Sequence, residues 1–307
     1  MKNGFTELRV GARTAPLGLR FWDPVTAAFV GDGLRVSAYP VADPTRRAAA
    51  SVSPSRVWVF HKLPGMGAVE RGEGDEAFWA SPPPKRTIVV EVDDDLGRFV
   101  PFQLEVEVPV RRPLEWTPPA GVSFPGMPPG AVPLFSSATR AVPRGLCVVR
   151  ADLWDPNAKT PPKNTKNTKN TKGPGGPGAW ALVTAAIDGL LGISGLADGE
   201  GRVLLIGPYP APMGGGEDGL TGVPLLKQSW PVSLSVRYEP GVSNAGERAK
   251  LSGAFSQAAG SLWQKWDADP AAREKLATTT LTLNYGEELP VRTTGAAPGG
   301  VLFVTRP

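Results

Sequence analysis

Alternating apolar and polar residues predict several short strands along this chain. In residues 33–39, Leu34, Val36 and Ala38 fall on one face and mostly polar residues fall on the other. The same period of two continues through 87–92 and 103–108. One buried face and one solvated face are typical of antiparallel sheets. Because such strands are joined by turns such as Asp-Gly-Glu-Gly at 198–201, the pattern predicts a mainly β protein of β-sandwich architecture.

The order of these elements occurs twice. Phe21-Trp22-Asp23-Pro24 returns as Leu153-Trp154-Asp155-Pro156, an offset of 132 positions. An Arg-Val pair at 56–57 returns at 202–203, and the alternating residues at 88–92 return at 232–236. We therefore expect two tandem β-sandwich domains, the first over 1–109 and the second over 145–307.

A proline-rich segment, 110–144, separates the two predicted domains. Positions 109–145 contain nine prolines, counting Pro109, and proline stiffens extended backbone, so a semi-rigid strap is expected. Trp116, Phe124 and Phe135 lie within it. These rings either pin the strap onto its own domains or anchor a partner protein.

The period of the apolar positions changes after residue 240. Apolar residues recur at helical spacing, and Asn-Ala-Gly-Glu at 244–247 is similar to a capping box, which together predict a helix over 245–266. Three glycines in this stretch each lower helix propensity by about 1 kcal/mol relative to alanine, so close packing should compensate. Phe255, Leu262 and Trp266 are expected to pack on the second sandwich or on a neighbouring subunit. The helix would form part of a helical insertion over 244–277, in which Asp269-Pro270 begins a second, short helix.

Composition excludes several classes of protein. Glycine (37) and proline (34) are too frequent among 307 residues for a helical bundle. One cysteine and one histidine exclude an intramolecular disulfide and the usual nitrogen and sulfur metal cages. No apolar stretch reaches the roughly 20 residues of a spanning helix, and no secretory signal is visible at the start. We therefore expect no membrane insertion and a cytoplasmic location, either free or within an assembled particle.

The net charge of +4 does not indicate a nucleic-acid-binding protein. Five lysines and no acidic residue lie within 157–172, and without these lysines the net charge is −1. The stretch 157–178 combines a repeated Asn-Thr-Lys triplet with glycine and proline, a low-complexity composition that predicts a surface loop. Basic residues that bind phosphates should instead come from ordered elements beside aromatic rings, so no nucleic-acid partner is expected.

Candidates for catalysis are few. A histidine-dependent triad would have to use His61, which we expect to face a turn at the end of a strand. Cys147 lies in a strand-like apolar run and is expected to be a small buried residue. The run of aspartates at 93–95 lacks the spacing of a calcium loop and is expected to form a solvated turn. These observations predict a protein that is not an enzyme and that has no cofactor, no metal site and no catalytic residues.

Both halves resemble a known family. The segment 197–205, Ala-Asp-Gly-Glu-Gly-Arg-Val-Leu-Leu, and the Pro-Tyr-Pro that follows it resemble the carboxypeptidase regulatory-like domain, and the resemblance covers roughly 17–109 and 145–240. It implies a transthyretin-like (immunoglobulin-like) sandwich in each half. A hydrolase of the transthyretin-like 5-hydroxyisourate type would need several histidines at one site, whereas this chain has one. The tandem order and the proline-rich connector are also similar to proteins encoded with phage-tail-like contractile injection systems.

Two classes of function follow. The favoured hypothesis is a structural or assembly protein whose partners are other protein subunits of a larger particle. The alternative is a stand-alone binding module, for example for carbohydrate, that uses Phe78, Trp79 and the other loop aromatics. The sequence indicates no oligomeric state.

Overall fold

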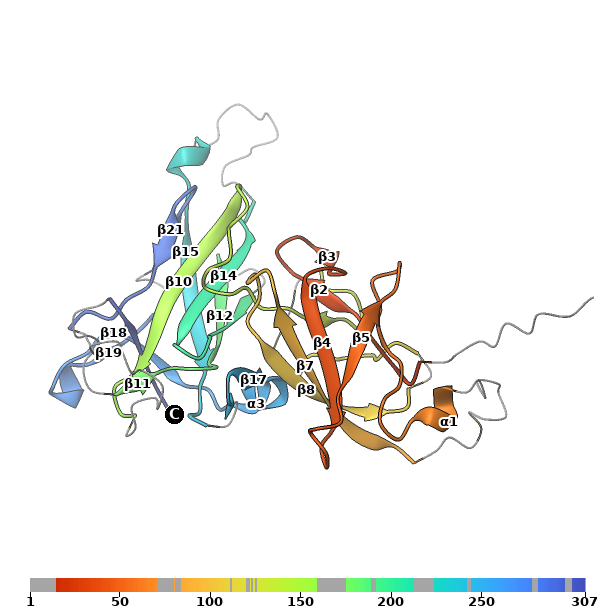
Figure 1. Cartoon of the computed structure of the whole chain (residues 1–307). Coiled ribbons are helices and arrows are strands. Elements are labelled where there is room, and N and C mark those ends of the chain that lie inside the picture. The colour runs from red at the N-terminus through yellow and green to blue at the C-terminus, as the bar shows by residue number, and fades with distance from the viewer. Residues whose placement is uncertain are drawn as a thin grey trace, which may run out of the picture.

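A computed structural model describes residues 15–70, 80, 84–110, 112–119, 122, 124, 126–158, 175–188, 192–211, 224–241, 244–277, 281–295 and 300–306. The protein is mainly β, as the alternating pattern predicts, and it forms two lobes that lie side by side (Figure 1).

The first lobe is built on an eight-stranded sheet with the strand order β1-β6-β5-β4-β7-β8-β17-β16. Its strands are β1 (Leu17–Leu19), β4 (Leu34–Pro40), β5 (Ala48–Val52), β6 (Trp58–Phe60), β7 (Arg86–Asp94), β8 (Phe102–Val108), β16 (Asn244–Ala245) and β17 (Arg248–Lys250). A small sheet of β3 (Ala28–Phe29), β2 (Phe21–Asp23) and β9 (Val132–Pro133) and a short helix α1 (Gly67–Glu70) complete the lobe. The predicted strands at 33–39, 87–92 and 103–108 are confirmed as β4, β7 and β8.

The second lobe contains two sheets. The larger has the order β11-β10-β22-β18-β19, with β14 and β21 also paired to β10, and the smaller has the order β13-β12-β15-β20. Side chains from both sheets meet in one hydrophobic core, as in a β-sandwich. The larger sheet contains β10 (Leu146–Asp155), β11 (Gly176–Pro177), β14 (Arg202–Pro208), β18 (Ser261–Lys265), β19 (Glu274–Lys275), β21 (Glu288–Pro290) and β22 (Leu302–Thr305). The smaller contains β12 (Leu182–Ile187), β13 (Ile193–Leu196), β15 (Ser229–Arg237) and β20 (Thr282–Asn284). The second half of the chain also contains three short helical segments, η1 (Leu225–Lys227), α3 (Leu251–Ser256) and η2 (Pro270–Ala272).

The same strand pairings occur in both lobes. β4 pairs antiparallel with β5 and β7, and β12 pairs antiparallel with β13 and β15. β1 pairs with β6 as β10 pairs with β14. The two Trp-Asp-Pro segments also take equivalent positions, because Phe21 pairs in parallel with Val132 and Leu153 pairs in parallel with Leu302. The repeat in the sequence therefore corresponds to a repeat in strand pairing.

The helix predicted over 245–266 is wrong. The structure has β16 and β17 at its start, the six-residue α3 in its middle and β18 at its end. Gly246 has φ +73° in the turn between β16 and β17, and a Cβ at Gly260 would lie 2.9 Å from the carbonyl oxygen of Thr305. These glycines serve a turn and a close backbone contact, so they interrupt a helix rather than line one. The predicted helical insertion over 244–277 therefore contains four short strands and only two short helical turns, although Asp269 does cap η2 through the amide of Ala271.

The hydrophobic core of the first lobe extends beyond residues 1–109. Its buried residues include Phe124, Leu134 and Phe135 from the strap, and also Leu251 and Phe255 from α3. The chain of the second half therefore returns to complete the core and the sheet of the first lobe, where β17 pairs in parallel with β8.

The low-complexity loop lies largely outside the described residues, which resume at Gly175. Within 157–178, Gly176 and Pro177 are not loop residues, since they form β11 and pair with the end of β10. None of the helices in the described ranges is long and apolar enough to cross a membrane.

Candidate functional site

The strap and α3 meet at an aromatic cluster in the core of the first lobe, here called the junction cluster, formed by Trp116, Phe124, Phe135 and Phe255. Phe255 on α3 lies 5.6 Å from Trp116, 6.4 Å from Phe124 and 6.3 Å from Phe135, measured between ring centroids. Phe124 and Phe135 are themselves 5.8 Å apart. Four of the predicted interaction residues therefore contact one another within the chain. This arrangement corresponds to the interpretation in which the rings pin the strap onto its own protein.

An ion pair joins β17, from the second half of the sequence, to β7 within the sheet of the first lobe. Arg248 of β17 donates two hydrogen bonds to the carboxylate of Asp93 on β7, at 2.9 and 2.8 Å. The hydrogen bonds to Asp93, opposed by partial burial, raise the pKa of Arg248 above its usual value. The side chains of Arg248 and Asp93 are only 27% and 18% exposed, so this bidentate pair holds a fixed geometry. The expected solvated turn at 93–95 is thus only partly correct, because Asp93 binds the other half of the chain.

A neutral side chain, Gln257, links the end of α3 to the second lobe. The amide nitrogen Nε2 of Gln257 donates to the carbonyl oxygen of Trp180 at 2.9 Å, and its Oε1 accepts from the backbone N–H of Glu239 at 2.8 Å. Gln257 is 1% exposed, and a buried amide with satisfied hydrogen bonds fixes the orientation of its neighbours.

The other predicted interaction residues do not join this site. Leu262 is 5% exposed and belongs to the core of the second lobe. Trp266 packs edge-on against Phe303, with the ring centroids 5.2 Å apart. Phe255, Leu262 and Trp266 thus serve three different contacts rather than one helix face. Phe78 and Trp79 lie outside the described residues.

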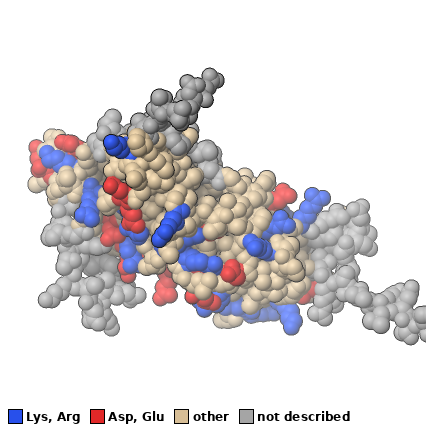
Figure 2. All heavy atoms as spheres, turned by 90° about the horizontal axis from the view of Figure 1, so that it is seen from above, with Lys and Arg blue, Asp and Glu red and all other residues tan. Residues whose placement is uncertain are grey.

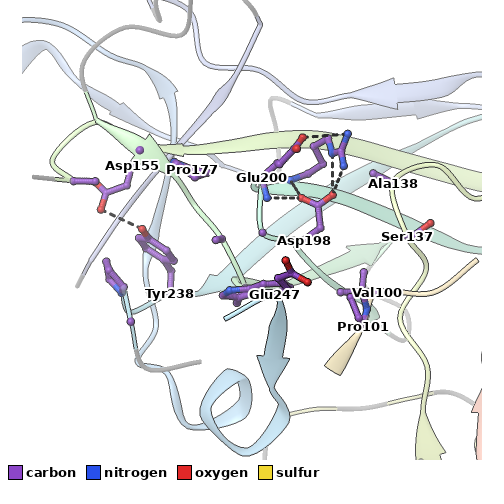
Figure 3. Close-up of a pocket in the computed structure, with 18 of the residues that line it drawn as sticks. Val100, Pro101, Ser137, Ala138, Asp155, Pro177, Asp198, Glu200, Tyr238 and Glu247 are labelled. Atoms are coloured by element: carbon purple, nitrogen blue, oxygen red, sulfur yellow. Dashed lines mark hydrogen bonds and ion pairs between the residues drawn. The ribbon is translucent and has the colours of Figure 1, made fainter. Parts of the chain in front are cut away.

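A cleft of about 1800 Å³ lies between the lobes (Figure 3). Its described walls include acidic and basic side chains from both lobes, among them Asp93, Asp155, Asp198, Glu247 and Arg273. Several of these carboxylates already have partners: Asp198 accepts from Nε of Arg202 at 2.8 Å, and Asp155 accepts from the Tyr238 hydroxyl at 3.2 Å. Burial, followed by the charge of Asp155, raises the pKa of Tyr238. These carboxylates therefore organise the walls of the cleft.

Two tryptophans that line the cleft, Trp263 and Trp266, each lie beside a cation. The guanidinium of Arg273 lies 3.7 Å from the centroid of Trp266, and the ammonium of Lys275 lies 6.0 Å from the centroid of Trp263. The indole N–H of Trp263 also donates to the Thr305 hydroxyl at 3.0 Å. Each of these two rings therefore has a cation over one of its faces.

The repeated Trp-Asp-Pro segments hold two buried carboxylates. Asp23 accepts from the backbone N–H of Val25, and Asp155 accepts from that of Asn157, so each forms the same local turn. Asp23 is 3% exposed and receives two hydrogen bonds, of 2.9 and 2.6 Å, from Arg140 at the end of the strap. Burial by itself would raise the pKa of Asp23, but the hydrogen bonds and charge of Arg140 outweigh it and hold that pKa below 3.8.

The sequence marked these aspartates by their repetition but gave no signal for their partners. Arg140 lies 117 positions from Asp23, and Tyr238 lies 83 positions from Asp155. The pair of Arg248 and Asp93, which is not part of the repeat, spans 155 positions. The sequence patterns used here extend over at most a few turns of helix or strand, so pairings at such separations were missed.

The residues considered for catalysis, His61 and Cys147, lie at the end of β6 and within β10. His61 directly follows β6, before Lys62 at φ +61°, and its Nδ1 is buried with no hydrogen-bond partner within the described ranges. Cys147 is 1% exposed in β10, which confirms that it is a buried residue. The described part of the chain contains no cluster of three or more His, Cys, Asp or Glu side chains that could hold a metal ion.

We expect Cys147 to be unreactive in the native protein. Burial raises the pKa of its thiol to about 11, so the thiolate is scarce at neutral pH. Alkylation of the folded protein at about pH 8 should be at least on the order of a hundredfold slower than in denaturant. Mass spectrometry of timed iodoacetamide reactions measures this difference, and labelling at the same rate in both states would contradict the burial of Cys147.

Comparison with protein-family models, curated proteins and solved structures returns no match.

Proposed function

We propose that this protein is a non-enzymatic structural component that assembles with other protein subunits through sheet edges, loops and the strap. The observation that carries the proposal is the junction, where residues of the second half complete the sheet and core of the first lobe. Such a junction makes one body of two lobes, which suits a component that must hold its neighbours at a fixed separation.

The proposal extends to the kind of sandwich and the kind of assembly. Each lobe is a variant of the transthyretin-like, carboxypeptidase regulatory-like sandwich, and the assembly is a phage-tail-like contractile injection particle formed in the cytoplasm. The recurrence of the same pairings in both lobes supports the first statement. The resemblance of the sequence to proteins encoded with such particles supports the second.

The distribution of charge favours protein partners over nucleic acid. Figure 2 shows acidic and basic side chains interspersed over the face it presents, rather than gathered by sign. A phosphate-binding surface would concentrate Lys and Arg on one face.

Genetic deletion tests the proposed function. We expect a host strain that makes the particle to lose intact particles when this chain is deleted, and to regain them when the wild-type chain is supplied. Electron microscopy of purified particles measures both. Unchanged particle number and shape in the deletion strain would contradict the proposal.

The non-enzymatic part of the proposal predicts that His61→Ala restores particles as well as the wild-type chain does. His61 is the only histidine, so any histidine-dependent chemistry would vanish with this substitution. Elemental analysis of the purified wild-type protein should also find less than stoichiometric zinc, iron or calcium. Failure of His61→Ala in complementation, with its melting temperature unchanged, would indicate a chemical role.

A further inference from the structure

The outer edge of β8 offers unpaired backbone groups. β7 pairs along the whole of β8, from Arg86 opposite Val108 to Val92 opposite Phe102. Thr87 accepts from Val41 on the β4 side, so the odd-numbered residues of β7 bond to β4 and the even-numbered ones bond to β8. In an antiparallel pair the bonding residues alternate, so Glu105 and Glu107 of β8 direct their N–H and C=O groups away from β7.

β17 covers only the beginning of this edge. It pairs with β8 at Phe102 and Gln103, where the N–H of Ala249 donates to the carbonyl oxygen of Pro101 at 3.1 Å. The chain then turns into α3 at Leu251 and leaves the sheet. In the part of the chain that the structure describes, no strand pairs with β8 on this side at Glu105 or Glu107.

An apolar groove of about 590 Å³ lies along the same edge, here called the edge groove. Leu104 and Val106 of β8 line it together with Leu114 and Trp116 of the strap, and Phe255 of α3 lines one end. Alternate side chains of a strand placed against β8 would point into this groove, because successive residues of a strand face opposite sides.

The charged residues around the edge groove indicate which side chains would suit the opposite face of a strand added to β8. Glu105, Glu107 and Glu115 are among its lining residues, and no lysine or arginine is among the described residues that line it. Glu105 and Glu107 do contact Lys250 and Lys85 at 3.6 and 3.4 Å, but the carboxylates are 44% and 64% exposed. Exposed pairs of this kind are weak and exchange readily.

We propose that the β8 edge accepts an extended segment of a partner subunit whose residues alternate between aliphatic and basic. This proposal rests on the assembly function proposed above and specifies how the partner subunit binds. Backbone groups of the segment bond to Glu105 and Glu107, its aliphatic side chains enter the edge groove, and its Lys or Arg side chains lie beside the two carboxylates. In this mode of recognition the partner segment becomes an additional strand of the first-lobe sheet, next to the part of β8 that β17 does not cover.

A peptide probe tests the site on the full chain. The probe is a blocked peptide of about seven residues that alternates lysine and valine, long enough to overlap 104–108 at about 3.3 Å per residue. Its controls are the same peptide with glutamate in place of lysine, and the same composition with lysines and valines in separate blocks. Fluorescence anisotropy gives the affinity, and amide hydrogen exchange shows where the peptide binds.

Two substitutions at one position separate the backbone from the charge. Glu107→Pro removes the outward N–H, which β7 does not use, whereas Glu107→Ala removes only the carboxylate. We expect Glu107→Pro to weaken binding by about tenfold or more relative to Glu107→Ala, which itself weakens binding only a few-fold. Glu287→Ala, an exposed carboxylate of the second lobe, is the matched control and should leave binding unchanged.

The outcomes separate this inference from the proposed function. Slower exchange at Glu105 and Glu107 with the alternating lysine peptide alone supports strand addition. Equal binding of the glutamate peptide, or no protection of these amides, would overturn it and leave the glutamates as protection of an edge strand against aggregation. Binding that occurs only after removal of residues 1–14 would assign the groove to this chain instead of a partner, which also overturns it. If the peptide fails to bind while deletion of the chain still abolishes particles, the assembly function stands and only this docking mode is wrong.

Discussion

Replacing Arg140 with alanine is expected to destabilise the protein by about 3–5 kcal/mol, because it leaves the buried carboxylate of Asp23 without its partner. The side chains of Arg140 and Asp23 are only 7% and 4% exposed. Urea unfolding followed by fluorescence measures the change. Lys85→Ala is the matched control, since it removes an exposed ion pair whose expected contribution is about 0–1 kcal/mol.

The same pair predicts the acid dependence of stability. The pKa of Asp23 is lower in the folded protein than its ordinary value of 3.8 in the unfolded chain. At a pH between these two values the unfolded chain therefore binds more protons than the folded protein. The contribution of Asp23 is complete above 3.8 and disappears as the pH falls through the folded pKa. Asp23→Asn should flatten this part of the stability curve. A similar loss for Arg140→Ala and Lys85→Ala, or an unchanged acid dependence in Asp23→Asn, would contradict the role of the pair.

Phe255→Ala should be about as costly, at roughly 3–5 kcal/mol, because it leaves a cavity beside three other aromatic rings. Phe255 is 4% exposed, and it links α3 to the strap. We expect the substitution to loosen the first lobe although residue 255 belongs to the second half of the sequence. Amide hydrogen exchange should therefore speed up in β8 more than in β12.

Leu262→Ala is the comparison for this experiment. Leu262 is similarly buried but lies in the core of the second lobe, so its truncation, at about 2–5 kcal/mol, should speed exchange in β12 first. If Phe255→Ala changed only the second lobe, or cost less than about 1 kcal/mol, α3 would not stabilise the core of the first lobe.

The strands were predictable from the sequence because their signal is local. In β4 and β8 the alternation of buried and less buried residues is regular, and it follows directly from the pleat of a strand. The sequence of β7 alternates in the same way, but residues 88–92 of this strand are all buried. The Trp-Asp-Pro repeat likewise identified two equivalent segments, each with a buried aspartate.

The junction was not predictable in the same way. Leu251, Phe255, Leu262 and Trp266 match the period of a helix, yet the chain between them bends so that they reach three separate packing sites. The spacing shows only which residues are apolar. The core in which each of them packs depends on contacts with the strap and with β22. The sequence identified the aromatic residues of the strap, and packing against their own chain was one of its two interpretations. Their common contact with Phe255 could be seen only in the folded structure.

Co-sedimentation with purified particles tests the central claim most directly. Particles from a strain carrying a tagged chain would be separated on a density gradient, and the amounts of this chain and of the particle's tube protein would be measured in each fraction by mass spectrometry. The account predicts a constant ratio of the two across the particle peak, retained after a high-salt wash. A tagged chain that stays in the light fractions, while intact particles sediment without it, would contradict the claim that this protein is a structural component of the assembly.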